Sequence, residues 1–264
     1  MRDSSLHAVV DRIDRFCDAV PRQWARAVDD GPLRLFARNG PGWPFYARPV
    51  PGGGPVTGAD VARMRARQRS LRLPESFEWV PAATPTMEDA VRDAGLRVVL
   101  CPLLVLDGDP RPQPLPPGYS ARLLGPADAD LLPAIGALNR VVADAFGFGT
   151  PAAPSLVELA ALRSDLATGK LARLLVTGPN GPVAAGSAQR AGDVVELVGI
   201  GTLESARGRG LAAAVTARLA AAARGAGADV VFLAAGDDRA SRVYQRVGFE
   251  VVGRTGMAEP PGRA

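Results

Sequence analysis

The sequence predicts an α/β protein built on a mixed sheet, with a smaller α/β domain ahead of it, and two observations support this. Residues 119–252 alternate apolar, strand-like runs with segments of helical periodicity, in the order strand, two helices, three strands, helix, strand, helix, strand. Ahead of them, residues 108–118 contain five prolines, which favour an extended linker. We therefore expect an N-terminal domain over residues 1–107 and a C-terminal domain over residues 119–264.

Local signals indicate each element of the C-terminal domain. Apolar residues recur at helical spacing within 126–145, and Ser155 is placed to cap the next helix. Two apolar runs joined by Gly178-Pro179-Asn180-Gly181 predict a hairpin. The expected strands are 119–124, 171–177, 183–190, 194–203, 230–234 and 248–252, and the expected helices are 126–145, 155–168, 211–225 and 237–247.

The most informative segment is Arg207–Ala212, which lies between an apolar strand and an alanine-rich helix. A strand, a glycine turn and a helix in that order present free backbone N–H groups at the helix N-terminus, where the helix dipole favours negative charge. Gly208 and Gly210 permit positive φ and close approach of a phosphate. The third glycine of the dinucleotide fingerprint and the Gly-Lys-Ser/Thr of the P-loop are both missing. The turn is therefore expected to hold a pyrophosphate in another way.

Two motifs together identify a family. Arg207, Gly210 and Ala212 fill the three fixed positions of Gln/Arg-x-x-Gly-x-Gly/Ala, and residues 240–249 match Ala-x-x-x-Tyr-x-x-x-Gly-Phe. In both motifs the chain resembles the Gcn5-related N-acetyltransferases (GNAT), in which the first motif binds acetyl-CoA. The resemblance covers residues 119–257 and implies the acyl-CoA N-acyltransferase fold.

The resemblance also implies an activity, the transfer of an acetyl group from acetyl-CoA to a primary amine by direct attack in a ternary complex. Tyr244 would protonate the leaving thiolate, and Glu196 would take a proton from the amine. Each has a plainer alternative, since Tyr244 can be a packed aromatic residue and Glu196 an outward-pointing strand carboxylate. Strict alternation would place Glu196 on the same sheet face as Val198, Ile200 and Thr202.

The resemblance further implies the donor and acceptor contacts. Asp237 stands near where the family often has an asparagine, but aspartate lacks the amide donor and can equally be a helix N-cap. Phe146 and Phe148, in a glycine-spaced loop, would border the acceptor. The expected acetyl-CoA contacts are Ile200, Gly201, Thr202, Arg207, Gly208, Arg209, Gly210, Leu211, Ala212 and Asp237.

Two other classes of function stay open at this point. A non-catalytic acyl-CoA-binding or interaction protein would keep the fold, and Asp237 favours it, as does the short chain left after Met257 for a last strand. A nucleic-acid-binding protein could use the arginine-rich helix around residues 63–72, but the aromatic residues typical of such surfaces are not interleaved there.

The composition of the chain excludes further kinds of site and of protein. The chain has a net charge of +4, a single histidine, His7, and two scattered cysteines, Cys17 and Cys101. These exclude a disulfide framework and argue against histidine catalysis and against a metal site. No apolar stretch reaches transmembrane length, and the N-terminus is unlike a secretory signal. We expect a cytoplasmic monomer or homodimer whose partners are acetyl-CoA and an amine, with neither a membrane nor a nucleic acid.

The N-terminal part repeats a portion of the C-terminal plan. A strand at 45–50, a helix at 57–71, a strand at 77–80 and a helix at 86–94 are followed by an apolar strand near 98–106. Two interpretations are open, a degenerate half-copy of the same fold and an unrelated α/β extension. Gly52–Pro55 offers no cofactor motif, so this half is not expected to bind acetyl-CoA. The strand 98–106 would complete the C-terminal sheet.

Overall fold

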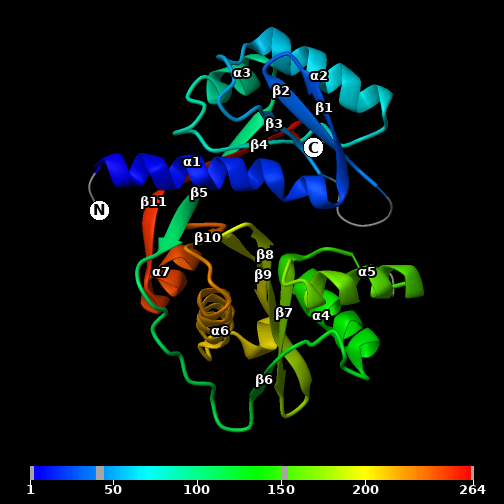
Figure 1. Cartoon of the computed structure of the whole chain (residues 1–264), viewed down its shortest axis with the longest axis vertical. Helices are drawn as coiled ribbons and strands as arrows, with labels where there is room; N and C mark the ends of the chain where they lie inside the picture. Colours follow the sequence, from blue (N-terminus) through cyan, green and yellow to red (C-terminus); the bar gives the residue numbers. More distant parts are fainter. Residues whose placement is uncertain (1–2, 40–44, 150–153, 263–264) are drawn as a thin grey trace. The chain divides into compact units, whose positions relative to one another are not determined.

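A computed structural model describes residues 3–39, 45–149 and 154–262 (Figure 1). The chain forms two compact units, one of residues 1–103 with 252–264 and the other of residues 104–251. Within the linker expected at 108–118 there is neither helix nor strand. The exact domain limits at 107 and 119 remain a prediction, and the last residues of the chain group with the N-terminal unit.

The first unit is a sheet in the order β1-β2-β3-β4-β11. Neighbouring strands in this order are antiparallel, except β3 and β4, which are parallel and are connected in the sequence through helix α2. Helices α2 and α3 bury their apolar sides against this sheet. The elements are α1 (Asp3–Ala19), the 3-10 turn η1 (Pro21–Gln23), β1 (Ala25–Asp30), β2 (Leu33–Arg38), β3 (Ala47–Pro49), α2 (Gly58–Ser70), β4 (Phe77–Trp79), α3 (Met87–Asp93), the start of β5 (Arg97–Leu106) and the end of β11 (Phe249–Glu259).

Helix α2 begins where the sequence places its capping residue. Thr57 accepts a hydrogen bond from the Asp60 N–H, and Asp60 accepts one from the Thr57 N–H, which together make a complete capping box. Val61, Met64 and Gln68 form the buried side of the helix. Because Gln68 donates to the carbonyl of Ser76 at 2.9 Å, the helix is also tied to the chain just before β4.

The second unit has the strand order β6-β7-β8-β9-β10, followed by the end of β5 and the start of β11. Here β9 and β10 are parallel neighbours that are connected in the sequence through helix α6, just as β3 and β4 are connected through α2. This repeated order supports the half-copy interpretation. The elements are β6 (Ser120–Leu123), α4 (Leu131–Phe146), α5 (Leu156–Ala167), β7 (Leu171–Gly178), β8 (Gly181–Ala191), β9 (Val194–Thr202), the 3-10 turn η2 (Glu204–Ala206), α6 (Leu211–Gly225), β10 (Val230–Ala234) and α7 (Asp238–Val247).

Small residues let α6 lie close to the sheet of the second unit. A Cβ on Gly186 would lie 2.7 Å from Val215 Cγ1 and 3.0 Å from Leu219 Cδ1, so β8 needs glycine at this position. The alanines of α6 fill the remaining contacts and are buried. Helix α4 packs in a separate cluster that includes Leu175 of β7 and Ala185 of β8. The sheet is therefore covered by α6 on one face and by α4 on the other.

Most elements expected from the sequence are present, with α4 starting at Leu131 rather than at residue 126. Helix α1 and strands β1 and β2 were not expected. The last strand was also underestimated, because β11 continues to Glu259 and ends just before Pro260, where the N–H needed for a ladder is lost. The apolar strand near 98–106 is β5, which lies beside β10 in the strand order, as predicted.

Candidate active site

The glycine turn before α6 is open on the side where an anion would approach. Gly208 and Gly210 adopt φ values of 77° and 76°, and no atom lies within 4 Å of where a Cβ would stand on either. Gly210 is the N-cap of α6, and no side chain of the residues that the structure describes caps the helix. In the described part of the chain, the N–H groups of Gly208, Arg209 and Gly210 donate no hydrogen bond. The turn therefore offers unused donors at the positive end of a helix dipole.

The Arg207 side chain holds the turn rather than pointing away from it. Its Nε donates to the carbonyl of Thr202, and its Nη2 donates to the carbonyl of Ala145, each at 3.4 Å. These long hydrogen bonds join the turn to the end of β9 and to the last residues of α4. Arg207 thus positions the turn, and the backbone N–H groups are the better candidates for phosphate contacts.

Strands β9 and β10 separate partway along their length. Their parallel ladder pairs Val194 with Val230 and ends at Glu196 opposite Phe232, although β9 continues to Thr202. Past that point, one edge of β9 faces the opening between the two strands. The Thr202 Oγ1 atom is buried and has no hydrogen-bond partner among the described residues. An extended polar chain with donors and acceptors, such as a pantetheine arm, fits such an edge.

A bulge in β9 changes which side chains share a face. Gly199 and Ile200 lie opposite the single residue Gly186, and Gly199 has a φ of 61°. Ile200 consequently packs with the α6 core, whereas Glu196 and Val198 precede the bulge and face the other way. The expectation that Ile200 and Glu196 share a face is therefore wrong, because the extra residue reverses the alternation.

Glu196 lies on the sheet face opposite α6. Its neighbours in sequence, Val195 and Leu197, are buried in the α6 core, so the Glu196 side chain points the other way. Gln189 of β8 is its direct cross-strand neighbour. Because Glu196 forms the last pair of the β9–β10 ladder, its carboxylate stands where the two strands begin to part.

Tyr244 is half-buried on α7 and packs against the α6 core. Burial, assisted by the negative charge of Asp237, raises the pKa of Tyr244 to about 12. The phenol is therefore protonated at neutral pH and able to give a proton to a thiolate. Asp237 is the N-cap of α7 and accepts a hydrogen bond from the Ala240 N–H at 2.6 Å, so the capping alternative accounts for its side chain.

Phe146 and Phe148 form an exposed aromatic pair at the end of α4. Their rings stack with centroids 5.9 Å apart, and each residue is about half exposed, at 51% and 49%. Phe146 also borders β9, since a Cβ on Gly201 would lie 3.5 Å from Phe146 Cε2. The structure thus brings the expected acceptor residues next to the expected donor strand.

Other candidates in the sequence have structural roles. The arginines of α2 are engaged with carboxylates, for example Arg63 with Asp30 and Arg65 with Glu75, as an ion-paired helix would be. Over the described ranges, no cluster of three or more His, Cys, Asp or Glu side chains could hold a metal. None of the helices in those ranges is long and apolar enough to cross a membrane.

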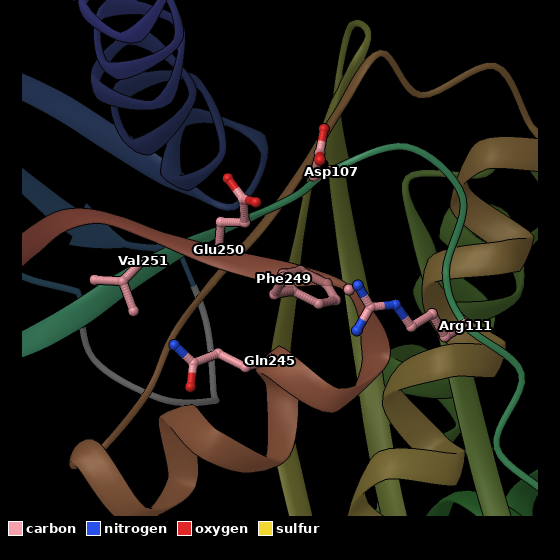
Figure 2. Close-up of a pocket in the computed structure, with 7 residues that line it drawn as sticks. Asp107, Arg111, Gln245, Phe249, Glu250 and Val251 are labelled. Carbon is pink, nitrogen blue, oxygen red and sulfur yellow. The ribbon is translucent and has the colours of Figure 1, made fainter. Parts of the chain in front are cut away.

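A pocket of about 430 Å³ lies elsewhere on the second unit, at the end of α7 (Figure 2). Arg111 gives it a positive charge, Asp107 and Glu250 give it negative charges, and Gln245 adds a neutral amide. The N–H of Arg111 donates to the carbonyl of Val247 at 2.8 Å, which fixes the segment after β5 against this end of the helix. None of the residues expected to bind donor or acceptor lines this pocket.

Comparisons with known proteins point to one family. The FR47-like protein family matches residues 175–256. A GCN5-related N-acetyltransferase from Kribbella flavida has a TM-score of 0.74 and 27% sequence identity, with 96% of each chain covered. A GCN5-related N-acetyltransferase-like protein from Streptococcus suis has a TM-score of 0.59 and 13% identity, covering 96% of this chain and 99% of that one. A tandem GNAT protein from the clavulanic acid biosynthesis pathway has a TM-score of 0.56 and 16% identity, with coverages of 88% and 79%.

No curated protein sequence gives a significant match. The structural matches confirm both the resemblance drawn from the two motifs and the expected fold class. The tandem GNAT neighbour has the two-part architecture that the half-copy interpretation expects. The roles of the individual residues remain predictions.

Proposed function

Because the chain has the fold of the GCN5-related N-acetyltransferases, we propose that it transfers an acetyl group from acetyl-CoA to a primary amine. The observation that carries the proposal is the open N-terminus of α6, which directly follows the opening between β9 and β10. A helix N-terminus with unused donors suits a pyrophosphate, and an unpaired strand edge suits the polar arm attached to it. Acyl-CoA donors have these two parts in this order.

The donor contacts follow from this arrangement. Backbone N–H groups from Gly208 to Ala212 would hold the pyrophosphate, with Arg207 keeping the turn in place. The β9 backbone from Ile200 to Thr202 would bind the pantetheine amides, and the unpartnered Thr202 Oγ1 supports this placement. The thioester would then lie deeper in the opening, near Glu196.

The chemical step needs one base and one acid. The amine loses a proton to Glu196, directly or through water, and its nitrogen attacks the thioester carbonyl carbon. The C–N bond forms, the C–S bond breaks, and the sulfur takes the proton of Tyr244. A phenol whose pKa is about 12 holds its proton until a thiolate forms. The acyl group moves directly to the amine, so no covalent acyl-enzyme is needed.

Calorimetric titration of the full chain with acetyl-CoA tests the donor site. We expect saturable binding that Gly210→Trp abolishes, because the indole would fill the space that the phosphates need. Gly227→Trp is the matched control, since Gly227 also has positive φ, at 81°, and open space around it, but lies just beyond the far end of α6. Equal loss in both variants, or no binding by the unaltered chain, would contradict the donor site.

The second candidate function is a non-catalytic acyl-CoA-binding protein, which the side-chain cap at Asp237 favours because that carboxylate is already engaged. Tyr244→Phe separates the two. An enzyme should release CoA about 100-fold more slowly in this variant while binding acetyl-CoA as before. A binding protein shows no amine-dependent CoA release in either form.

A further inference from the structure

Arg173 of β7 has an unused binding edge. Its Nη1 donates to Ser187 Oγ at 3.0 Å, while its Nε is buried and lacks a hydrogen-bond partner among the described residues. Among the same residues, Nη2 has no hydrogen-bond partner, since the bond to Ser187 comes from Nη1. The Nε and Nη2 hydrogens point in parallel from one edge of the guanidinium, which is the geometry with which arginine binds a carboxylate through two hydrogen bonds.

The charge of Arg173 is also uncompensated. No carboxylate of the described residues forms an ion pair with it, and burial lowers the pKa of its guanidinium with no opposing contribution from a negative neighbour. A desolvated cation without a partner destabilises a fold. Such a group is a candidate for a functional site, where a ligand supplies the missing charge.

Arg173 and Glu196 lie on the same face of the sheet. The strand register pairs Arg173 with Ser187 and Ser187 with Val198, and Val198 lies two residues from Glu196 on β9. Side chains of paired residues share a face, and this is the face opposite α6. Two strand spacings and two residue rises separate the Cα atoms of Arg173 and Glu196 by roughly 12 Å. Their long side chains can therefore approach one small molecule from two sides.

Building on the proposed amine acetylation, we infer that the acceptor carries a carboxylate as well as its amine, and that Arg173 binds this carboxylate through Nε and Nη2. Glu196 faces the amine, and Ser187 fixes the guanidinium through Nη1. The acceptor is then a small amino acid, and Arg173 is the residue that determines this specificity.

The test compares amino acids with their amides, in which the carboxylate charge is removed. Glycine, β-alanine, 4-aminobutanoate and 6-aminohexanoate are each titrated beside the matching amide into the full chain saturated with CoA, and binding is followed by saturation-transfer NMR. We expect at least one acid to bind about 10-fold or more tightly than its amide, the range of a charge-assisted hydrogen-bond pair. Arg173→Gln should remove this preference.

Two further variants keep the test decisive. Arg190→Gln removes an arginine from β8 that donates to the carbonyls of Gly192 and Ala226, and it should keep the preference. Arg173→Lys keeps the charge but lacks the two-donor edge, so it should lose most of the preference even if the glutamine variant does not fold. Equal binding of acids and amides, no binding of either, or a preference that survives in both Arg173 variants would overturn the inference.

CoA release by the unaltered chain with acetyl-CoA and the same amino acids is measured in parallel. Acid-selective binding without CoA release would contradict acetyl transfer but leave the carboxylate site standing. CoA release with amines that is indifferent to the carboxylate would support the transfer and overturn the role of Arg173.

Discussion

The two parallel crossovers of the molecule, β3–α2–β4 and β9–α6–β10, share their element order but differ at the helix N-terminus. In α2, Thr57 and Asp60 satisfy each other's N–H groups, and the Val56 N–H donates to Thr86 Oγ1 at 2.9 Å. In α6, a glycine stands at the N-cap, and among the described residues no side chain caps this helix. The N-terminus of α2 is thus capped by a carboxylate of the chain itself, whereas the N-terminus of α6 can bind an external anion.

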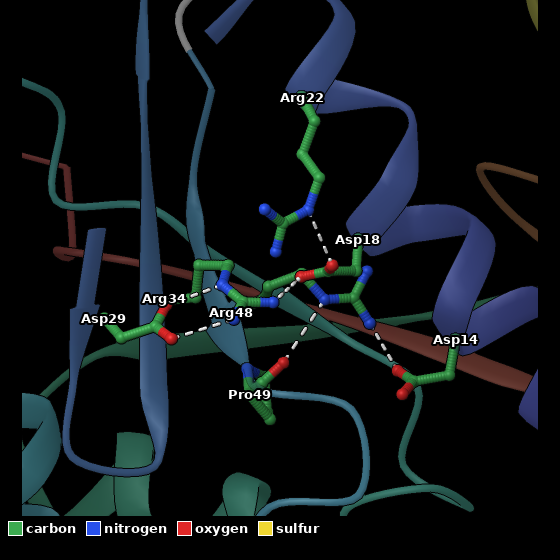
Figure 3. A network of polar contacts seen from close by, with 7 residues as sticks. All are labelled: Asp14, Asp18, Arg22, Asp29, Arg34, Arg48 and Pro49. Carbon is green, nitrogen blue, oxygen red and sulfur yellow. Dashed lines mark hydrogen bonds and ion pairs between the residues drawn. The ribbon is translucent and has the colours of Figure 1, made fainter. Parts of the chain in front are cut away.

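One arginine in each unit repeats this difference. Arg48 of β3 forms an ion pair with Asp14 of α1 and donates to the carbonyl of Pro49 (Figure 3). Among the described residues, Arg173 of β7 has a hydrogen bond to Ser187 and no ion pair. The contrast concerns these two arginines: Arg48 has a carboxylate partner, whereas the Nε of Arg173 has no hydrogen-bond partner among the described residues. It does not extend to every buried polar atom, since Gln68 Oε1 and Trp79 Nε1 of the first unit also lack such a partner among those residues.

Breaking the internal pairing of the first unit should have the largest effect. Asp14→Ala leaves Arg48, which is 1% exposed, without its carboxylate, and should lower the free energy of unfolding by about 3–5 kcal/mol. All three tryptophans lie in residues 1–103, so their fluorescence during denaturant unfolding reports this unit. Asp18→Ala is the control and should cost less, because Arg34 keeps its second partner, Asp29. Equal losses of unfolding free energy in the two variants would mean that burial of the Arg48–Asp14 pair does not increase its contribution to stability.

Placing a carboxylate at the N-cap of α6 should remove the difference between the N-termini of α2 and α6. Gly210→Asp places a carboxylate at the anion site and should weaken acetyl-CoA binding about 100-fold, or about 2.7 kcal/mol, through charge repulsion. Gly210→Asn has the same shape without the charge and tolerates the positive φ equally well, so its loss should be smaller than 10-fold, a rough limit set by shape alone. Calorimetry measures both. Equal weakening by the two variants would show that steric fit, rather than charge, governs the turn.

A smaller effect is expected from a substitution in the strand that follows the helix of the first crossover. Strand β4 carries Glu78 where its counterpart β10 is apolar, and burial, opposed by Arg48, raises the pKa of Glu78 to about 7. Because the folded pKa exceeds the ordinary value of 4.5, the ionised form destabilises the fold above pH 7, and this penalty disappears as the pH falls toward 4.5.

Glu78→Gln should therefore stabilise the first unit by about 1–3 kcal/mol at pH 8.5 and have little effect near pH 5. Tryptophan fluorescence during denaturant unfolding at the two pH values measures this change. A gain that is independent of pH would contradict a titrating Glu78.

Local chemistry explains why some features could be predicted from the sequence. Thr57 and Ser155 are capping residues followed three positions later by Asp60 and Glu158, and both form complete capping boxes. Helix α1 has no Glu or Gln three residues after Ser4 or Ser5, so no capping box marks its start in the sequence. The short strands β1 and β2 alternate weakly between apolar and polar residues. The bulge at Gly199 depends on pairing with β8, which periodicity along a single strand does not contain.

The order of the elements in residues 119–252, the glycine turn, the two capping boxes and the two family motifs could be predicted from the sequence, because these depend on neighbours within a few residues. Which buried polar groups find a partner depends on long-range packing and is visible in the structure alone. Arg48 and Arg173 are both arginines in strands with apolar neighbours on each side in the sequence, and this local pattern does not distinguish them. Arg48 pairs with a carboxylate 34 residues away in the sequence, whereas Arg173 has a serine hydroxyl as its one partner in the described ranges, because long-range packing decides which polar groups find partners.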